Sequence, residues 1–192
     1  MARIDVSIEK IRSKLIISQN GSESCEPDTT CAAILVPLVQ KENDWSLLFT
    51  RRSDKVASHQ NEVSFPGGSF EQNDLSLETT ALREAQEEIG VHPDKITLLG
   101  ALPFSTTITG YKVYPFVGVI DWPIEFRINS EEVTSVFTIP ITWLIDERNY
   151  YEADYHSPEF GVRKVIHYQQ FQGEHLWGYT ARVTRQFLEL IK

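Results

Sequence analysis

The strongest constraint on the fold is an uninterrupted apolar run, TTCAAILVPLV, at residues 29–39. A strand that is apolar on both faces is usually buried on both, so this run predicts a central strand of a sheet. A second β-type run, WSLLFT at residues 45–50, follows a polar turn at 41–44. The two runs predict a hairpin or a pair of neighbouring strands.

The rest of the chain alternates between strand-type and helix-type patterns. Further strands are expected at residues 96–101, 113–120, 132–139 and 162–171. Helices are expected at residues 4–17, 75–89 and 180–191, with Gly90 as the cap that ends the second. Residues 52–74, rich in polar residues and glycine, are expected to form a long functional loop. No repeat or linker divides the chain, so a single mixed α/β domain covering residues 1–192 is predicted.

The composition is that of an ordinary soluble globular protein, with 41% hydrophobic and 23% charged residues. The formal net charge of −9 argues against broad nucleic-acid binding, because such binding needs a basic surface. A few local Arg or Lys residues, together with metal ions, still suffice to bind a small polyanion in one cleft. Nucleic acid is therefore not an expected partner.

Cys25 and Cys31 are the two cysteines of the chain. Without a nearby histidine cluster they make neither a zinc site nor a disulfide framework, so free, partly buried thiols are expected. Free thiols fit a reducing cytoplasm. The charged N-terminus lacks the apolar core of a signal peptide, and no stretch is long enough to cross a membrane as a helix. We therefore expect a cytoplasmic protein with no membrane partner.

Chemistry-bearing residues concentrate between positions 67 and 91. On a helix, Glu84, Glu87 and Glu88 fall within an arc of roughly 100° on one exposed face. Carboxylates this close repel one another unless a cation neutralises them, and oxygen-only ligands suit Mg²⁺ or Mn²⁺. Gly67 and Gly68 allow the backbone to pass close to such a site. The pattern predicts a divalent metal site.

The alternative is that these glutamates form a solvated helix face and that Arg83 makes a routine surface ion pair. The three glutamates alone favour this alternative. The glycine pair, Arg83 and the dipeptide Gly90-Val91 stand at fixed spacing around them, and the whole pattern favours the metal site.

The segment resembles the Nudix box, in which a glycine and a spacer precede Arg-Glu-apolar-x-Glu-Glu-x-Gly-apolar. The second half matches from Arg83 to Val91, and the box spans about residues 67–91. The acidic residue of the first half is out of register, because Leu75 stands eight positions before Arg83. Glu71 and Asp74 are the carboxylates available for that role.

The resemblance implies a Nudix-type α/β/α sandwich with a mixed sheet, and an enzyme that cleaves a diphosphate linkage. It implies that the Gly68 carbonyl and the three glutamates bind Mg²⁺ or Mn²⁺, while Arg83 holds the glutamates and the loop. The implied catalytic residues are Glu84, Arg83, Glu87 and Glu88, with Glu84 the first choice for the general base. The implied chemistry is neutralisation of the diphosphate and attack on phosphorus by water made more acidic.

A second layer of residues is similar to the coenzyme A diphosphatase branch of the Nudix hydrolases. The segments that carry this likeness are 47–53, 58–59, 62–68, 80–85, 107–110, 114–118, 132–133 and 176–181. For this branch the implied products are 4'-phosphopantetheine and adenosine 3',5'-bisphosphate. Ala57 stands where the branch usually has a basic residue, and Asn61 where it usually has a glycine.

Candidate substrate-binding residues lie in the same region: Arg51, Arg52, Lys55 and His59. The first three supply local positive charge for a phosphate, whereas a lone histidine in a polar loop is more often incidental. Aromatic residues of a small domain are usually core, although they can also stack on an adenine; the candidates are Trp143, Trp177, Tyr179 and Phe187. No serine stands in a nucleophile elbow, so a Ser-His-Asp triad is not expected.

Three hypotheses follow. The first is a coenzyme A or acyl-coenzyme A diphosphatase. The second is a Nudix hydrolase of another nucleoside diphosphate derivative, such as ADP-ribose or a dinucleotide. The third is a non-catalytic Nudix-fold binding module, against which the complete set of Arg83 and the three glutamates counts. A homodimer is a possible assembly.

Overall fold

The computed structural model describes residues 7–15, 25, 29–42, 44–157 and 161–192. Its helices are α1 (Ile8–Lys14), α2 (Leu77–Ile89), α3 (Ile141–Leu144) and α4 (Gly178–Ile191). Its strands are β1 (Cys31–Lys41), β2 (Asp44–Arg52), β3 (Val63–Ser64), β4 (Gly67–Ser69), β5 (Ile96–Ala101), β6 (Ser105–Thr106), β7 (Lys112–Ile120), β8 (Val133–Pro140), β9 (Tyr150–Ser157) and β10 (Gly161–Tyr168).

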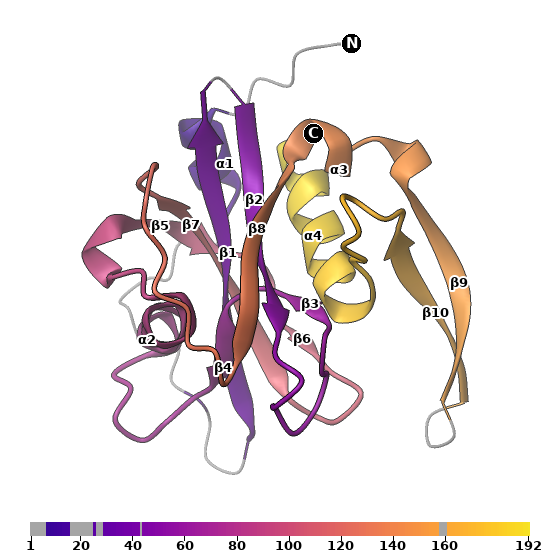
Figure 1. The fold of residues 1–192 in the computed structure, drawn as a ribbon, viewed down its shortest axis with the longest axis horizontal. Helices are drawn as coiled ribbons and strands as arrows, with labels where there is room; N and C mark the ends of the chain where they lie inside the picture. The colour runs from indigo at the N-terminus through magenta and orange to yellow at the C-terminus, as the bar shows by residue number, and fades with distance from the viewer. Residues whose placement is uncertain (1–6, 16–24, 26–28, 43, 158–160) are drawn as a thin grey trace.

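The centre of the fold is a mixed sheet in which β1 lies between β2 and β7 (Figure 1). Strand β1 runs parallel to β7 and antiparallel to both β2 and β4. Its apolar run is buried along almost its whole length, as the sequence predicts for a central strand. The predicted hairpin is also confirmed, since Leu38 pairs with Leu47 and Lys41 with Asp44.

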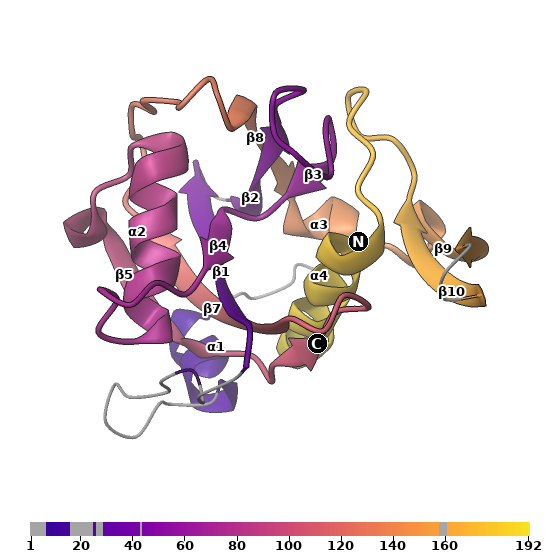
Figure 2. The same ribbon diagram turned by 90° about the horizontal axis from the view of Figure 1, so that it is seen from below.

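Helices cover both faces of this sheet (Figures 1 and 2). Because side chains alternate along a strand, β1 serves two cores. Ala33 and Leu35 pack with the apolar face of α2. Val36 and Leu38 pack with residues of α1 and α4 on the other side. This division confirms the predicted α/β/α arrangement.

Strands β9 and β10 form a separate two-stranded antiparallel ribbon. It extends beside α4, on the side away from the main sheet (Figure 1). The sequence predicts β10, but β9 was not predicted, because most of its side chains are exposed and it carries no apolar run. The predicted long loop at 52–74 also contains two short strands, β3 and β4.

At the N-terminus, the expected helix over residues 4–17 is observed over Ile8–Lys14. Residues 4–6 and 16–17 lie outside the described residues. Among the helices of the described ranges, none is both long and apolar enough to cross a membrane.

The prediction of free thiols is wrong, because Cys25 and Cys31 form a disulfide. The bond joins the segment before the sheet to the first residue of β1, where Cys31 is buried at 3% exposure. A count of two cysteines does not predict a framework of several disulfides. It also does not exclude a single disulfide between cysteines six residues apart, which is what the structure shows. With both cysteines in a disulfide, no free thiols remain that would indicate a reducing compartment.

Candidate metal and active site

The glycine pair is held beside α2 by pairing with the central strand. Gly67 and Gly68 in β4 lie opposite Ile34 and Ala33 in β1. A Cβ added at Gly68 would lie 2.3 Å from Oε1 of Glu84, closer than any side chain tolerates. Only glycine therefore allows Glu84 and the β4 backbone to approach each other this closely.

Arg83 joins the loop to the helix. Its Nη1 donates to Glu84 Oε1 at 3.0 Å and to Glu87 Oε2 at 2.8 Å. Its Nη2 donates to the backbone carbonyl of Ser69 at 3.0 Å, directly after the glycine pair. The hydrogen bonds to Asp74 and the surrounding carboxylates raise the pKa of Arg83, so the guanidinium stays charged.

The structure identifies Asp74 as the loop acid that binds Arg83. Its carboxylate is buried and accepts from Nε and Nη2 of Arg83 at 3.0 and 3.1 Å. It also accepts from the Thr80 hydroxyl at 2.9 Å and the Glu71 backbone N–H at 3.0 Å. Burial alone would raise the pKa of Asp74, but these hydrogen bonds outweigh it and lower the pKa. The Glu71 carboxylate is 61% exposed and lies 3.8 Å from Arg83, so its contact is peripheral.

Glu88 is not on an exposed helix face, which corrects the sequence-based expectation. The residue is 2% exposed, whereas the Glu87 side chain is 51% exposed. Burial and the negative charge of Glu84 raise the pKa of Glu88 to about 8. Burial likewise raises the pKa of Glu84.

A segment from further along the chain crosses the end of α2 and contacts its last carbonyls. The backbone N–H groups of Arg127 and Asn129 donate to the Ile89 and Glu88 carbonyls, each at 3.0 Å. Gly90 takes a left-handed conformation with φ 72° and ends the helix as predicted. Beyond Asn129, the segment brings the charge of Glu132 close enough to Glu84 and Glu88 to raise the pKa of both.

Glu132 is a further candidate site residue, which the sequence patterns did not single out. Asn129 Nδ2 donates to Glu132 Oε1 at 3.1 Å and orients the carboxylate. The available signal was the Glu132-Val133 pair among the segments similar to the coenzyme A branch. A single glutamate at a loop–strand junction, with no spacing relationship to the box, does not stand out otherwise.

The acidic residues fit a divalent cation. Oε2 of Glu88 is buried and has no hydrogen-bond partner among the described residues. A buried carboxylate oxygen without a donor is costly, and the nearby glutamates add repulsion that a cation relieves. The donors are all oxygens, which suits Mg²⁺ or Mn²⁺.

The acidic side chains of the described residues do not stand in a metal-ligand geometry. Within the described ranges, no three acidic, histidine or cysteine side chains converge on one point that would hold an ion. Arg83 engages one oxygen each of Glu84 and Glu87, which accounts for part of this.

Three of the four candidate substrate-binding residues contact acids of the chain itself. Arg51 forms an ion pair with Glu174 and donates to the Asn61 carbonyl at 2.9 Å. Lys55 pairs with Glu131 at 2.7 Å. The third is His59, which contacts Glu62.

His59 Nδ1 lies 3.0 Å from the carboxylate of Glu62, and this hydrogen bond raises the pKa of His59. Both His59 and Asn61 adopt left-handed backbone conformations, with φ 57° and 59°. Asparagine tolerates this conformation better than most residues, which explains how Asn61 stands where the branch usually has glycine. Asn61 therefore adopts a backbone conformation that glycine would also allow.

Arg52 differs from the other three. Its charge lies close enough to Glu88 to lower the pKa of that carboxyl, against the larger effect of burial. Its Nε is buried and has no hydrogen-bond partner in the described part of the chain. Arg52 is thus the candidate cation that lies nearest the buried glutamate.

The aromatic candidates mostly belong to the core. Phe187 is fully buried, and Trp143 and Tyr179 pack against the same cluster. Trp177 instead stacks on His167, with ring centroids 5.6 Å apart and planes inclined by 13°. None of these contacts places an aromatic ring beside the glutamates.

Comparison with known proteins decides the family. The model of the NUDIX domain family matches residues 29–171, which include the glycine pair, the helix of glutamates and Glu132. The chain belongs to the Nudix family. An uncharacterised Nudix hydrolase named NudL, from Yersinia enterocolitica, is 32% identical over 185 residues, which are 96% of this chain and 93% of that protein.

Solved Nudix structures share the fold at low sequence identity. A MutT/nudix family protein from Enterococcus faecalis superposes with a TM-score of 0.53 at 15% identity, covering 86% of this chain and 62% of that one. The Nudix domain of NrtR from Shewanella oneidensis, solved with ADP ribose, gives 0.50 at 19% identity, covering 64% of this chain and 80% of that one. At these identities the likeness supports the Nudix fold of the whole sandwich and nothing finer.

Proposed function

We propose that this Nudix hydrolase cleaves the diphosphate linkage of coenzyme A or its acyl derivatives, giving 4'-phosphopantetheine and adenosine 3',5'-bisphosphate. The observation that carries the hydrolase chemistry is Oε2 of Glu88, which is buried beside Glu84 and the glycine pair and has no hydrogen-bond partner in the described ranges of the chain. A surface helix with routine ion pairs would not bury such a group.

Glu84, Glu87 and Glu88, with the Gly68 carbonyl, would hold the divalent cation, Mg²⁺ or Mn²⁺. A cation bound there supplies the positive charge that neutralises diphosphate oxygens and makes nearby water more acidic. Arg83 fixes Glu84 through Oε1, which leaves Glu84 Oε2 to accept a proton from the attacking water. Asp74 holds Arg83 in place, so its contribution is to position rather than to touch substrate.

Of the four candidate substrate-binding residues, Arg52 is the best placed to meet a phosphate oxygen. Its buried Nε has no partner among the described residues, and an ionic hydrogen bond to phosphate would satisfy it. Arg51, Lys55 and His59 would have to leave Glu174, Glu131 and Glu62 to do the same. Glu132, held by Asn129, is a further carboxylate able to take part in metal or proton binding.

The coenzyme A assignment rests on the resemblance over residues 47–68 and 107–110. The second of these segments forms a tight turn in which the Thr107 hydroxyl accepts from the Tyr111 N–H at 3.0 Å. Gly110 takes φ 89° in that turn. The likeness there is explained partly by turn structure, so the first segment, with its arginines, carries most of the weight for substrate choice.

A panel of diphosphates tests the proposal. Coenzyme A, acetyl-coenzyme A, ADP-ribose and a diadenosine polyphosphate are incubated with Mg²⁺ or with Mn²⁺, and products are separated by chromatography. We expect 4'-phosphopantetheine from coenzyme A. If only ADP-ribose or the dinucleotide is cleaved, the chain is a Nudix hydrolase of another nucleoside diphosphate derivative. If nothing is cleaved, the binding-module hypothesis replaces the enzyme.

A cytoplasmic location and a homodimer are also part of the proposal. Size-exclusion chromatography with light scattering tests the dimer, and cell fractionation tests the location.

A further inference from the structure

The segment between β10 and α4 forms a tight hairpin that carries Glu174. Phe171 donates its N–H to the Glu174 carbonyl at 3.0 Å and accepts the Glu174 N–H at 2.9 Å. Between them, Gln172 and Gly173 have φ of 53° and 87°. Positive φ at both central positions is typical of the type I′ turn that closes two-residue hairpins. The Phe171 ring packs on Trp143, with centroids 5.0 Å apart, so the position of Glu174 is fixed from both the backbone and the core.

The Glu174 carboxylate binds Arg51, at the end of β2, through both of its oxygens. Nε of Arg51 donates to Oε1 at 3.3 Å, and Nη2 donates to Oε2. The remaining nitrogen, Nη1, donates to the backbone carbonyl of Asn61 at 2.9 Å. Arg51 thus joins the hairpin to the loop between β2 and β3, and the two segments lie side by side in Figure 2.

Arg51 and Arg52 are neighbours on β2 and therefore face opposite sides of the sheet. Phe49, two positions before Arg51, packs in the core cluster shared with α4. Leu48 packs in the cluster beside α2. The alternation places Arg51 on the α4 side and Arg52 on the α2 side, where its charge acts on Glu88. Because both side chains stand on one short stretch of backbone, the contact that holds Arg51 also sets the position of Arg52.

The backbone of this stretch is hydrogen-bonded to both neighbouring loops. Arg52 donates its N–H to the Glu62 carbonyl at 2.9 Å, and Ser53 donates to the Glu132 carbonyl at 2.8 Å. The register between β2 and β8 shifts between Arg51 and Arg52, an irregularity of the kind that re-aims side chains beside active sites. Nε of Arg52 is buried and lacks a hydrogen-bond partner in the described part of the chain. The direction of this side chain therefore depends on the backbone that carries it.

We propose that Glu174 is a positioning residue of the active site, which holds Arg51 and thereby keeps Arg52 directed at the substrate phosphate. Arg51 is then a structural link and not a phosphate ligand. Glu174 itself contacts neither metal nor substrate. The inference rests on the proposed function in one respect, the binding of phosphate by Arg52.

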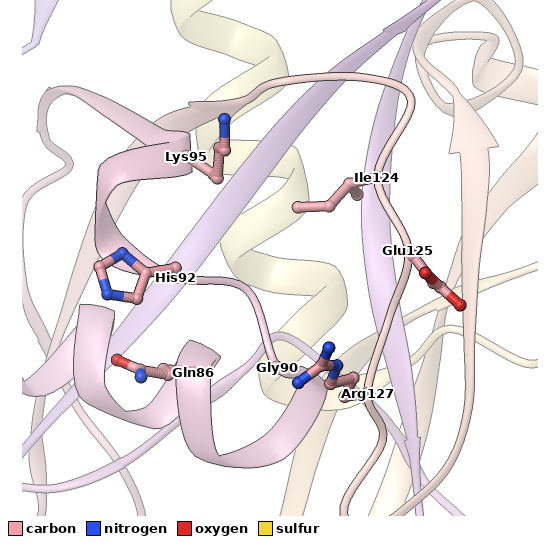
Figure 3. Close-up of a pocket in the computed structure, with 7 residues that line it drawn as sticks. All are labelled: Gln86, Gly90, His92, Lys95, Ile124, Glu125 and Arg127. Carbon is pink, nitrogen blue, oxygen red and sulfur yellow. The ribbon is translucent and has the colours of Figure 1, made fainter.

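The test compares Glu174→Gln with the matched control Glu125→Gln. The substitution at Glu174 keeps the size of the side chain and removes the charge that binds Arg51. Glu125 is exposed and forms no ion pair with the described residues, and its carboxylate points away from the other residues that line a hollow at the end of α2 (Figure 3). Glu174→Asp, which keeps the charge but shortens the reach, is a milder second variant that should change each measurement in the same direction. The ¹⁵N amide spectrum of each variant checks that it is folded.

The first measurement is hydrolysis of coenzyme A. For Glu174→Gln we expect KM to rise about tenfold and kcat to stay within about twofold, as when a charge-assisted contact to bound phosphate weakens. Partial unfolding would instead lower kcat and leave KM unchanged. Glu125→Gln should behave like the wild type. In Arg52→Ala/Glu174→Gln, KM should equal that of Arg52→Ala, because two residues that act through one contact are not additive.

Two kinetic results would overturn the proposal. The first is an unchanged or lowered KM for Glu174→Gln. A lowered KM would mean that Glu174 competes with substrate for Arg51. The second is an equal rise in KM on adding Glu174→Gln to the wild type and to Arg52→Ala.

The second measurement needs no substrate. The Nε–H signal of Arg52, assigned by its loss in Arg52→Ala, should exchange with water more slowly than those of exposed arginines, because Nε is buried. In Glu174→Gln this exchange should be at least about tenfold faster, since local opening controls it. Glu125→Gln should keep the wild-type rate. An unchanged rate in Glu174→Gln overturns the positioning role, whether or not any diphosphate is cleaved. Faster exchange in a chain that cleaves no diphosphate contradicts the proposed function and supports the link from Glu174 to Arg52.

Discussion

The Arg83 guanidinium binds both carboxylate oxygens of Asp74, from Nε to Oδ1 at 3.0 Å and from Nη2 to Oδ2 at 3.1 Å. The same guanidinium binds Glu84 and Glu87 through its remaining nitrogen. Asp74 thereby fixes the orientation in which Arg83 presents itself to the glutamates. The loop acid is thus part of the support of the site, although it stands one position outside the usual register.

Replacing Asp74 should therefore weaken both the fold and the site. Asp74→Asn loses one arm of the two-pronged contact and leaves Arg83 poorly matched, which should lower the free energy of unfolding by about 2 kcal/mol. The matched control is Glu71→Gln, whose exposed carboxylate lies at 3.8 Å and should contribute less than about 0.5 kcal/mol. Urea unfolding of both variants measures the difference. Equal effects would mean that the two acids share the role.

Glu88→Gln should abolish turnover yet stabilise the metal-free protein at alkaline pH. The pKa of Glu88 is raised to about 8 from an ordinary value of 4.5. The folded state therefore binds this proton more tightly than the unfolded state. The stability that the protonated Glu88 carboxyl contributes to the folded state is complete below pH 4.5 and is lost as the pH rises through 8. Glutamine at this position carries no charge at any pH, so the variant does not lose this contribution to stability at alkaline pH.

The measurement is urea unfolding of wild type and Glu88→Gln at pH 5, 6.5 and 8.5 in chelator. The stability of Glu88→Gln relative to wild type should grow with pH, at up to about 1.4 kcal/mol per unit of pH. Glu87→Gln, on the exposed side of the helix, should show no such trend. Parallel curves for wild type and Glu88→Gln would show that Glu88 is solvated in solution.

Most of the layered fold could be predicted from the sequence, because the fold depends largely on local sequence patterns. The apolar run of β1, the helix α2 with its Gly90 cap and the helix α4 were all predicted close to their observed bounds. Strand β9 was not, since Tyr150–Ser157 carries exposed polar residues and owes its extended form to pairing with β10.

In the candidate site, too, the features set by local sequence could be predicted, whereas those set by contacts with distant segments could not. One helix contains the four residues Arg83, Glu84, Glu87 and Glu88, so their relative positions could be predicted from their spacing in the sequence. The presence of Glu132 near Glu84 and Glu88 depends on the Arg127–Glu132 segment, which is far along the chain and has no pattern that predicts where it crosses α2. The choice of Asp74 over Glu71 likewise depends on how the loop folds back onto Arg83.

Divalent cations should stabilise the protein. The repulsion among Glu84, Glu88 and Glu132 is relieved when a cation binds, and a ligand that binds only the folded state adds stability by mass action. Tm in millimolar Mg²⁺ or Mn²⁺ should exceed Tm in chelator. Glu84→Gln/Glu88→Gln should lose this increase, while the distant control Glu152→Gln should keep it. An unchanged Tm of the wild type on addition of the cation would contradict the proposed metal site.

Reducing the disulfide should destabilise the protein moderately. The Cys25–Cys31 bond closes a short loop, with a sequence separation of six, for which loop-closure entropy amounts to about 2 kcal/mol. Dithiothreitol should lower the stability of the wild type and leave Cys25→Ser unchanged. Cys25 is the residue to replace, because Cys31 packs in the core beside Ala33. If dithiothreitol changes neither protein, the cysteines are free thiols in solution.

Substrate choice tests the account most directly. The measurement is kcat/KM for coenzyme A, dephospho-coenzyme A and ADP-ribose with the same metal ion. We predict that coenzyme A is cleaved with the highest kcat/KM. We expect this preference for coenzyme A to be narrow, because Ala57 stands where the resembled branch usually has a basic residue. One ionic hydrogen bond of about 1.5–3 kcal/mol corresponds to a factor of roughly ten to a hundred in kcat/KM. A kcat/KM for ADP-ribose more than about tenfold above that for coenzyme A, a difference of about 1.4 kcal/mol, would contradict the coenzyme A assignment.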